Sequence, residues 1–256
     1  MKKVFTTLSL ALLAMVACDK AEMTTDSKEK GSVAISCGVA TEVEMTRAEL
    51  TTQVQCTCPT TDEFALEIDG ATSEYHAEYA SVAEFQNGYL YRGDYIATVE
   101  AGDVANEGYN CVAFVGQKQF SVEPRKHIDV QITATIANAL VMVEVTDAFK
   151  SYFAGGYELI LTTEQGNTFD VTSQSDYLYI APTSFTIAAT GTKQPNESGA
   201  EGAVVALPEF KREELAARTI YTVKYDVSEA GEATLTISLG GIVEEYTFDN
   251  ELNQYA

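Results

Sequence analysis

Apolar and polar residues alternate along most of the chain from residue 31 onward. Val33, Ile35, Cys37 and Val39 fall on one face of an extended segment, with small or polar residues between them. Because successive side chains of a strand point to opposite faces, this alternation predicts a half-buried β-strand. The same alternation, or a run with strong β propensity, recurs in residues 64–68, 95–99, 109–115, 119–122, 127–136, 140–146, 157–163, 177–180, 184–188, 204–207, 220–227, 233–239 and 242–248.

The spacing of these runs predicts the fold class. They are short and are separated by Gly, Asn or Asp, which is typical of a β-sandwich. Helix signals are confined to residues 81–84, which have the spacing of a capping box, and residues 209–217, which follow a proline. We therefore expect an all-β protein. One strand pattern ends near residue 136 and an equivalent one begins, which predicts two tandem sandwich domains, residues 31–136 and 137–256.

The N-terminal segment has the pattern of an export signal. Two lysines precede an apolar stretch too short to span a bilayer, and a small residue stands directly before Cys18. This arrangement resembles a bacterial lipoprotein signal, which implies that residues 1–17 are removed and that Cys18 carries the lipid. A plain secretory signal is the alternative. Residues 18–30 are polar and without periodicity, which predicts a flexible tether between lipid and fold.

The chain is strongly acidic. Its formal net charge is −22, and losing Lys2 and Lys3 with the signal lowers the charge by two, to −24. Such a surface repels nucleic acids and anionic lipid headgroups, so we expect no nucleic-acid partner and a membrane contact through the lipid alone. Since 46% of the residues are apolar, the chain is not a disordered acidic tail.

Four cysteines follow Cys18, namely Cys37, Cys56, Cys58 and Cys111. In an exported chain disulfides persist, so these residues are candidates for one. Cys56 and Cys58 are two positions apart and poorly placed to bond each other, so we expect one of them to pair with Cys37 or Cys111. Free thiols are the alternative.

The residues that catalysis requires are scarce. The chain has no nucleophile elbow, zinc-protease motif, Walker loop or dinucleotide fingerprint. Its two histidines, His76 and His127, are isolated in the sequence, and no second cysteine pair accompanies them. A zinc site needs a compact set of ligands, so we expect no metal, no cofactor and no enzymatic activity.

One feature favours a different kind of function. Tyr75, Tyr79, Tyr89, Tyr91 and Tyr95 gather in one region, and tyrosine rings can serve as flat platforms for sugars. A glycan-binding lipoprotein of a polysaccharide-uptake system is therefore the alternative function. The competing interpretation is that tyrosine is simply common in strands.

The middle of the chain carries a family resemblance. A strand pattern in residues 128–136 is followed by Ala137-Asn138-Ala139, another alternating run, and a segment of the form F-K-x-Y-F at residues 149–153. Residues 221–227 have the form Y-T-V-K-Y-D-V. These features resemble fimbrillin-like surface lipoproteins of the Bacteroidota, in a domain-of-unknown-function branch related to fimbrial subunits.

The resemblance implies two tandem Greek-key or transthyretin-like sandwiches on a lipid-anchored protein of the outer membrane, exposed at the cell surface. It implies a structural or adhesive role, with other fimbrial subunits or host and glycan ligands as partners, and no catalytic residues. In polymerising relatives a trypsin-like protease cuts after an arginine near the first strands, and Arg47 is the first arginine here. Cleavage would release residues 18–47. An uncut chain would instead fit an anchor, a tip subunit or a stand-alone adhesin.

Overall fold

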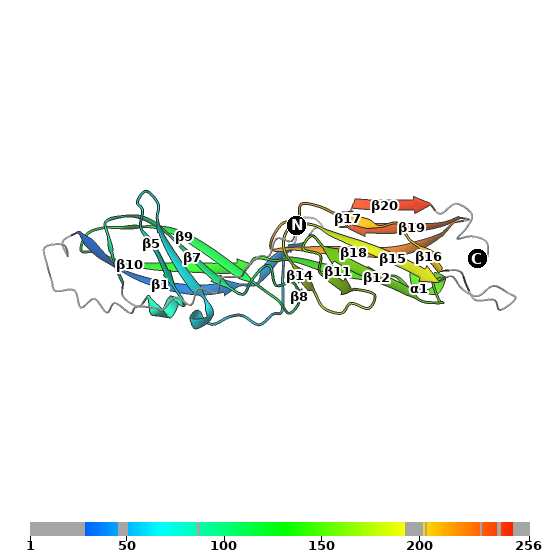
Figure 1. The fold of residues 1–256 in the computed structure, drawn as a ribbon, viewed down its shortest axis with the longest axis horizontal. Coiled ribbons are helices and arrows are strands. Elements are labelled where there is room, and N and C mark those ends of the chain that lie inside the picture. The colour runs from blue at the N-terminus through cyan, green and yellow to red at the C-terminus, as the bar shows by residue number, and fades with distance from the viewer. Residues whose placement is uncertain are drawn as a thin grey trace, which may run out of the picture.

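The computed structural model describes residues 29–45, 51–85, 88–192, 202, 204–230, 232–239 and 242–247, with side chains through residue 227. Strands dominate these residues, which confirms the all-β expectation. Figure 1 shows an elongated molecule in which most strands of the N-terminal half, up to residue 136, lie at one end. The strands of the C-terminal half lie at the other end. No helix in the described part has the length and apolar character needed to span a membrane.

The N-terminal half is built on one seven-stranded sheet, called sheet A. β1 and β10 run parallel in it, and the other neighbouring strands run antiparallel. Across the sheet the order is β5 (His76–Tyr79), β4 (Ala65–Gly70), β7 (Gly93–Ala101), β9 (Phe114–Val122), β10 (His127–Ile136), β1 (Lys30–Ala40) and β6 (Gly88–Tyr91).

Sheet A folds over between β9 and β10. These strands pair through Val115 with Thr135 and Phe114 with Ile136, and they separate toward the turn that joins them. Alternating side chains from both strand groups are buried in one hydrophobic cluster, for example Val99 of β7 and Ile132 of β10, each 0% exposed. The two groups therefore face each other as the layers of a sandwich.

The C-terminal half contains two further sheets. Sheet B has the order β20 (Ile242–Thr247), β19 (Glu232–Leu239), β18 (Thr219–Ala230), β11 (Ala139–Val145), β14 (Leu178–Ile180) and β8 (Gly108–Tyr109). In addition, β2 (Glu42–Met45) pairs with β18, and β3 (Thr51–Gln53) pairs with β2. Sheet C has the order β13 (Thr168–Asp170), β12 (Tyr157–Thr163), β15 (Phe185–Thr192) and β16 (Val204–Ala206), with β17 (Phe210–Arg212) on β15. Val141 and Val223 of sheet B meet Leu161 and Ile187 of sheet C in the second core.

The helix prediction for residues 209–217 is wrong. Phe210–Arg212 forms strand β17 along β15, and the Phe210 ring is 97% buried in the second core, since only 3% of it is exposed. Burial of this ring outweighs the helix propensity of the charged residues that follow. The capping-box segment, residues 81–84, forms only the short 3-10 helix η3 (Val82–Glu84). A second 3-10 helix, η2, spans Thr61–Glu63.

One α-helix was not predicted. α1 (Asp147–Tyr152) begins after Thr146, whose Oγ1 accepts a hydrogen bond from the backbone N–H of Phe149. This contact satisfies one of the free N–H groups of the first helical turn. The helix carries Phe149, which is fully buried, into the second core.

The two halves are joined by more than the chain. β10 ends at Ile136 and β11 begins at Ala139, but β2, β3 and β8 come from the N-terminal half and pair within sheet B. Asn138, in the connection from β10 to β11, is fully buried. Its Oδ1 accepts a hydrogen bond from the N–H of Ala113 at 2.7 Å. Leu140 and Ile220 of sheet B pack into the first core.

Candidate functional site

The strand that the resemblance singles out, β1, lies between two described strands of sheet A only near its start. Nine residues, Ser32 to Ala40, pair in parallel with His127 to Thr135 of β10, and on the other side Lys30 to Val33 pair with the short strand β6. Val33 is fully buried, while Ile35, Cys37 and Val39 are partly buried against the first core. The alternation predicted for this segment therefore places its apolar face on the core.

Near its start, β1 lies very close to the neighbouring turn. A Cβ added to Gly31 would lie 2.5 Å from the backbone oxygen of Glu123 and 2.7 Å from a methyl group of Val122. The backbone N–H of Ser32 donates to the carbonyl of Lys126 at 2.9 Å, and that of Arg125 donates to the carbonyl of Lys30 at 2.9 Å. A glycine is required here because no side chain fits between the two backbones.

β1 continues directly into β2, which pairs within sheet B of the C-terminal half. Glu44 and Met45 of β2 pair in parallel with Thr219 and Ile220 of β18, and Val43 is fully buried in the first core. Figure 1 shows β1 running from the far end of the N-terminal half to the middle of the molecule. Residues 30–45 thus contact both sandwiches. The candidate cleavage site Arg47 follows this segment but lies outside the described residues, as does the predicted lipid attachment site Cys18.

The five tyrosines do not form one platform. Tyr95 is 4% exposed and stacks on Phe120, so it cannot contact a sugar. Tyr75 packs edge-on against Tyr95, and Tyr79 packs against Phe85. Burial raises the pKa of Tyr75 and Tyr95, as expected for phenols that form part of a core.

Two of the predicted tyrosines are exposed. Tyr89 and Tyr91 are 69% and 42% exposed, lie two residues apart on β6, and therefore point to the same side of the sheet. The Nζ of Lys30 lies 4.3 Å from the centre of the Tyr91 ring. The aromatic surface is thus limited to β6, at the edge beside β1.

The cysteines are free thiols in the structure, so the predicted disulfide is not formed here. Cys37 and Cys56 are partly buried and Cys58 is exposed. Burial raises the pKa of the Cys37 and Cys56 thiols, and the neighbouring Cys58 adds to the effect on Cys56. These thiols are therefore less ionised than usual, which disfavours a nucleophilic role.

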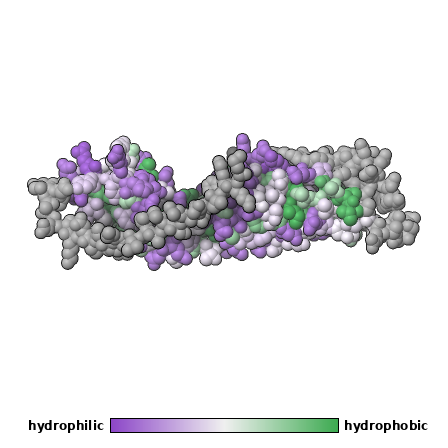
Figure 2. Space-filling view, viewed as in Figure 1, coloured by the Kyte–Doolittle hydropathy of each residue, from purple (hydrophilic) through white to green (hydrophobic). Residues whose placement is uncertain are grey.

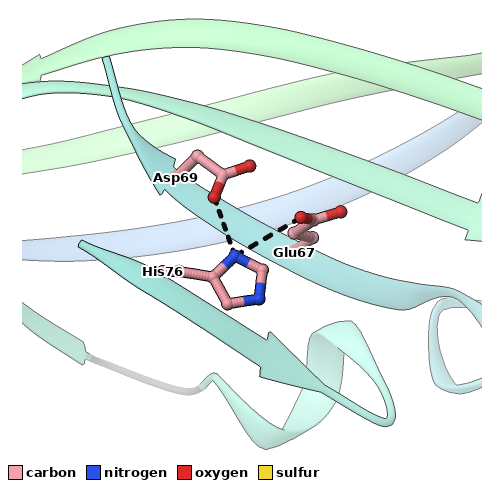
Figure 3. A group of neighbouring side chains, drawn as sticks. All are labelled: Glu67, Asp69 and His76. Carbon is pink, nitrogen blue, oxygen red and sulfur yellow. Dashed lines mark hydrogen bonds and ion pairs between the residues drawn. The ribbon is translucent and has the colours of Figure 1, made fainter. Parts of the chain in front are cut away.

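The two histidines have different surroundings. His127 contacts Ser32 Oγ and one carboxylate, Asp129, at the start of β10. His76 instead lies near three carboxylates of β4 and β5. Figure 3 shows two of them, Glu67 and Asp69, beside the His76 ring. Its hydrogen bonds to Asp69 and Glu78 raise its pKa. Sequence spacing did not suggest this group, because the strand register, and not the chain order, brings the side chains together.

The two halves differ in the hydropathy of their described surface. In Figure 2 the described surface of the N-terminal half is mostly hydrophilic, and the larger hydrophobic patches lie on the C-terminal half. The large apolar side chains that the described part exposes are Tyr89 and Tyr91 of β6, Tyr109, Val115 and Val204.

Comparison with solved structures finds distant likenesses. A fimbrial assembly protein from Parabacteroides distasonis is 10% identical with a TM-score of 0.40, covering 86% of this chain and 98% of that one. The fimbrial anchor protein Mfa2 from Porphyromonas gingivalis is 9% identical with a TM-score of 0.38, covering 84% of this chain and 98% of that one. TM-scores this low do not establish a shared topology. Comparison with curated proteins finds no match.

A comparison with models of protein families identifies the family of this chain. The model described as "Domain of unknown function (DUF4493)" matches residues 29–254, which include both sandwiches. This confirms the expectation of a domain-of-unknown-function branch. The chain therefore belongs to the DUF4493 family.

Proposed function

We propose that this chain is a cell-surface structural or adhesion protein of the fimbrillin type, held at the outer membrane by lipid on Cys18. It acts through strand edges and surface shape and not through catalysis. The observation that carries the proposal is the position of β1: a half-buried strand that pairs with β10, contacts both halves through β2, and is followed by Arg47.

The proposed assembly step follows from this position. Cleavage after Arg47 would remove β1 and β2 together and leave the edge of β10 without its nine-residue partner. The apolar surface beneath Val33, Ile35 and Val39 would then be open to water. Full burial of one such side chain is worth about 1.5–3 kcal/mol, so the open groove favours a replacement strand from another subunit. This is assembly by β-augmentation.

Whether the chain is cut after Arg47 distinguishes a polymerising subunit from an uncut anchor, tip subunit or adhesin. N-terminal sequencing of the chain from native membranes is expected to give Ala48 for a polymerising subunit. A chain that still begins at lipidated Cys18 removes the polymerising role and leaves an anchor, a tip subunit or an adhesin. A Cys18→Ala variant is expected to appear in the soluble fraction, and its retention in the membrane would contradict the lipid anchor.

The proposed replacement of β1 by a strand from another subunit can be tested separately. Limited digestion with a trypsin-like protease is expected to convert the full-length chain into higher-order species that resist detergent. An Arg47→Gln variant should remain monomeric under the same digestion. Arg92→Gln, which alters the next arginine along the chain, is the control and should behave as the unaltered chain does. A peptide of residues 30–45 added in trans should block assembly by filling the groove.

A glycan-binding role is the second candidate, and the exposed pair Tyr89 and Tyr91 is the observation that favours it. Binding on a glycan array that is lost in Tyr89→Ala and Tyr91→Ala variants would support this role. Tyr109→Ala is the matched control, because Tyr109 is 38% exposed but lies on β8, away from β6. Absence of saturable binding, or equal loss in the control, would reject it.

A further inference from the structure

The group around His76 is assembled by the register of one hairpin. Asp69 of β4 pairs with His76 of β5, and Glu67 pairs with Glu78 two residues further along. Residues two apart on a strand point to the same side, so all four side chains share the outer face of the hairpin. Paired strands hold ligands more rigidly than a loop does, which is a requirement for a defined binding site.

The geometry of three of these groups suits a bound ion. The Nδ1 of His76 lies 2.8 Å from Oδ1 of Asp69 and 3.4 Å from Oε1 of Glu67, and one ligand atom from each residue lies within 4.8 Å of the others. In a tetrahedral zinc site with bonds of about 2.1 Å, neighbouring ligand atoms are about 3.4 Å apart. Small side-chain shifts would therefore place all three atoms around one ion. Figure 3 shows the two carboxylates converging on the same edge of the imidazole ring.

A fourth residue supplies the partner that a metal-binding histidine usually has. The Nε2 of His76 lies 3.2 Å from Oε1 of Glu78. A neutral imidazole that donates its Nε2 proton to this carboxylate presents the lone pair of Nδ1 to Asp69 and Glu67. Metal-ligating histidines commonly donate their second N–H to a carboxylate in this way, which fixes the tautomer. Glu78 is thus a positioning residue and not a ligand.

The charges also favour a cation. Glu67 and Glu78 are directly opposed across the two strands, and opposed like charges destabilise a sheet. A divalent ion bound to Glu67 would offset part of this repulsion, because it would neutralise negative charge on the Glu67 side. The three ligand side chains are 45%, 44% and 52% exposed for Glu67, Asp69 and His76, and a surface groove beside them is lined by Glu67, Glu78 and Glu100. Water or a partner group can therefore complete the coordination from that side.

We propose that Glu67, Asp69 and His76 bind a divalent transition metal of the zinc type at the outer face of the β4–β5 hairpin. An imidazole nitrogen with two carboxylate oxygens is a donor set that zinc accepts. The open coordination position can take water or a side chain from a neighbouring molecule. The competing account is a protonated imidazole held by three carboxylates, with no ion involved.

Isothermal titration of the full-length, detergent-solubilised chain with Zn²⁺ tests the proposal. One saturable site is expected. His76→Gln is expected to weaken binding by at least about 100-fold, and Glu78→Gln by about 10-fold, in the range found when a partner of a metal ligand is removed. His127→Gln is the matched control, because His127 is also 52% exposed and contacts a single carboxylate. It should bind as the unaltered chain does.

X-ray absorption of the zinc-loaded chain provides a second measurement, which should show one imidazole nitrogen and carboxylate oxygens in the first coordination shell. The proposal is overturned if no saturable binding occurs, or if His127→Gln weakens binding as much as His76→Gln. It is also overturned if His76→Gln leaves zinc binding unchanged, since the carboxylates would then bind cations without the imidazole. Circular dichroism of each variant checks that these exposed substitutions leave the fold intact.

Discussion

The two halves of the molecule begin in the same way but hold their first strand differently. β1 runs parallel to β10, and β11 runs parallel to β18. β11 is buried at Ala139, Leu140, Val141 and Val143 and lies between β18 and β14. In β1 only the positions near the start are buried, and its outer neighbour is the four-residue strand β6. One pairing scheme thus gives a strand that is buried along most of its length in one half and a strand that is buried only near its start in the other.

The cores differ in the same sense. In the C-terminal half α1 brings Phe149 against Phe153, Tyr157 and Tyr225, with ring centroids 4.7, 5.3 and 5.8 Å away. Such ring pairs add to the stability gained from burial. In the N-terminal half the face of β1 contributes the fully buried Val33 and the partly buried Ile35 and Val39. The comparison indicates that release of a strand is less costly from the N-terminal sandwich.

The largest expected effect tests this difference directly. Phe149→Ala should lower the free energy of unfolding by about 3–5 kcal/mol, because it removes a fully buried ring from the core of the C-terminal half. Ile35→Ala, on the partly buried face of β1, should cost about 1–2 kcal/mol, below the range for buried isoleucine. Urea-induced unfolding measures both. Equal losses would mean that β1 is held as firmly as the second core.

A smaller loss of stability is expected when Gly31 of β1 is replaced by alanine, and no loss when Gly38 of the same strand is replaced. Gly31→Ala should destabilise the fold by about 1–3 kcal/mol, because the new Cβ would displace β1 from the 123–126 turn. Gly38→Ala is the matched control, since a Cβ there has no neighbour within 4 Å. It should be neutral or slightly stabilising. Thermal unfolding compares them, and a Gly31→Ala variant as stable as Gly38→Ala would contradict the close approach.

The smallest effect concerns the connection between the halves. Glu107 accepts hydrogen bonds from the N–H of Ala181 at 2.9 Å, from Thr163 Oγ1 at 2.5 Å and from Asn167 Nδ2 at 2.8 Å. Glu107→Gln should cost about 1 kcal/mol, because it weakens charge-assisted bonds that attach the segment before β8 to the C-terminal half.

The control for this connection is Glu164→Gln. Glu164 accepts a hydrogen bond from Ser184, and both residues lie in the C-terminal half. Loss of this bond therefore leaves the contacts of Glu107 intact. Urea unfolding should show a smaller change for Glu164→Gln than for Glu107→Gln. The reverse order would show that Glu107 does not hold the halves together.

Much of the fold followed from local pattern, and the failures have identifiable causes. Alternation located strands such as β1 and β7, because the period of two depends only on which face is buried. The helix predicted at residues 209–217 failed because Phe210 is buried in a core formed by distant strands. Tyr95, a candidate sugar contact under the alternative function, is buried, since neighbouring strands and not the local sequence decide which aromatic residues are covered.

The candidate sites divide in the same way. Cys18 and Arg47 were located by motif and stay predictions, because both lie outside the described residues. The His76 group was missed, since Glu67 and Asp69 are separated from it along the chain and meet it only through the β4–β5 register.

By itself, the sequence determined the strand-rich composition, the position of most strands and the acidic exterior, because these depend on local periodicity and charge. Only the tertiary structure decided that β1 pairs in parallel with β10, that β2 crosses to the other half, and that one histidine lies among carboxylates while the other does not. Those features depend on which strands become neighbours. Strand pairing is set by contacts between residues far apart in the chain, and no local pattern records them.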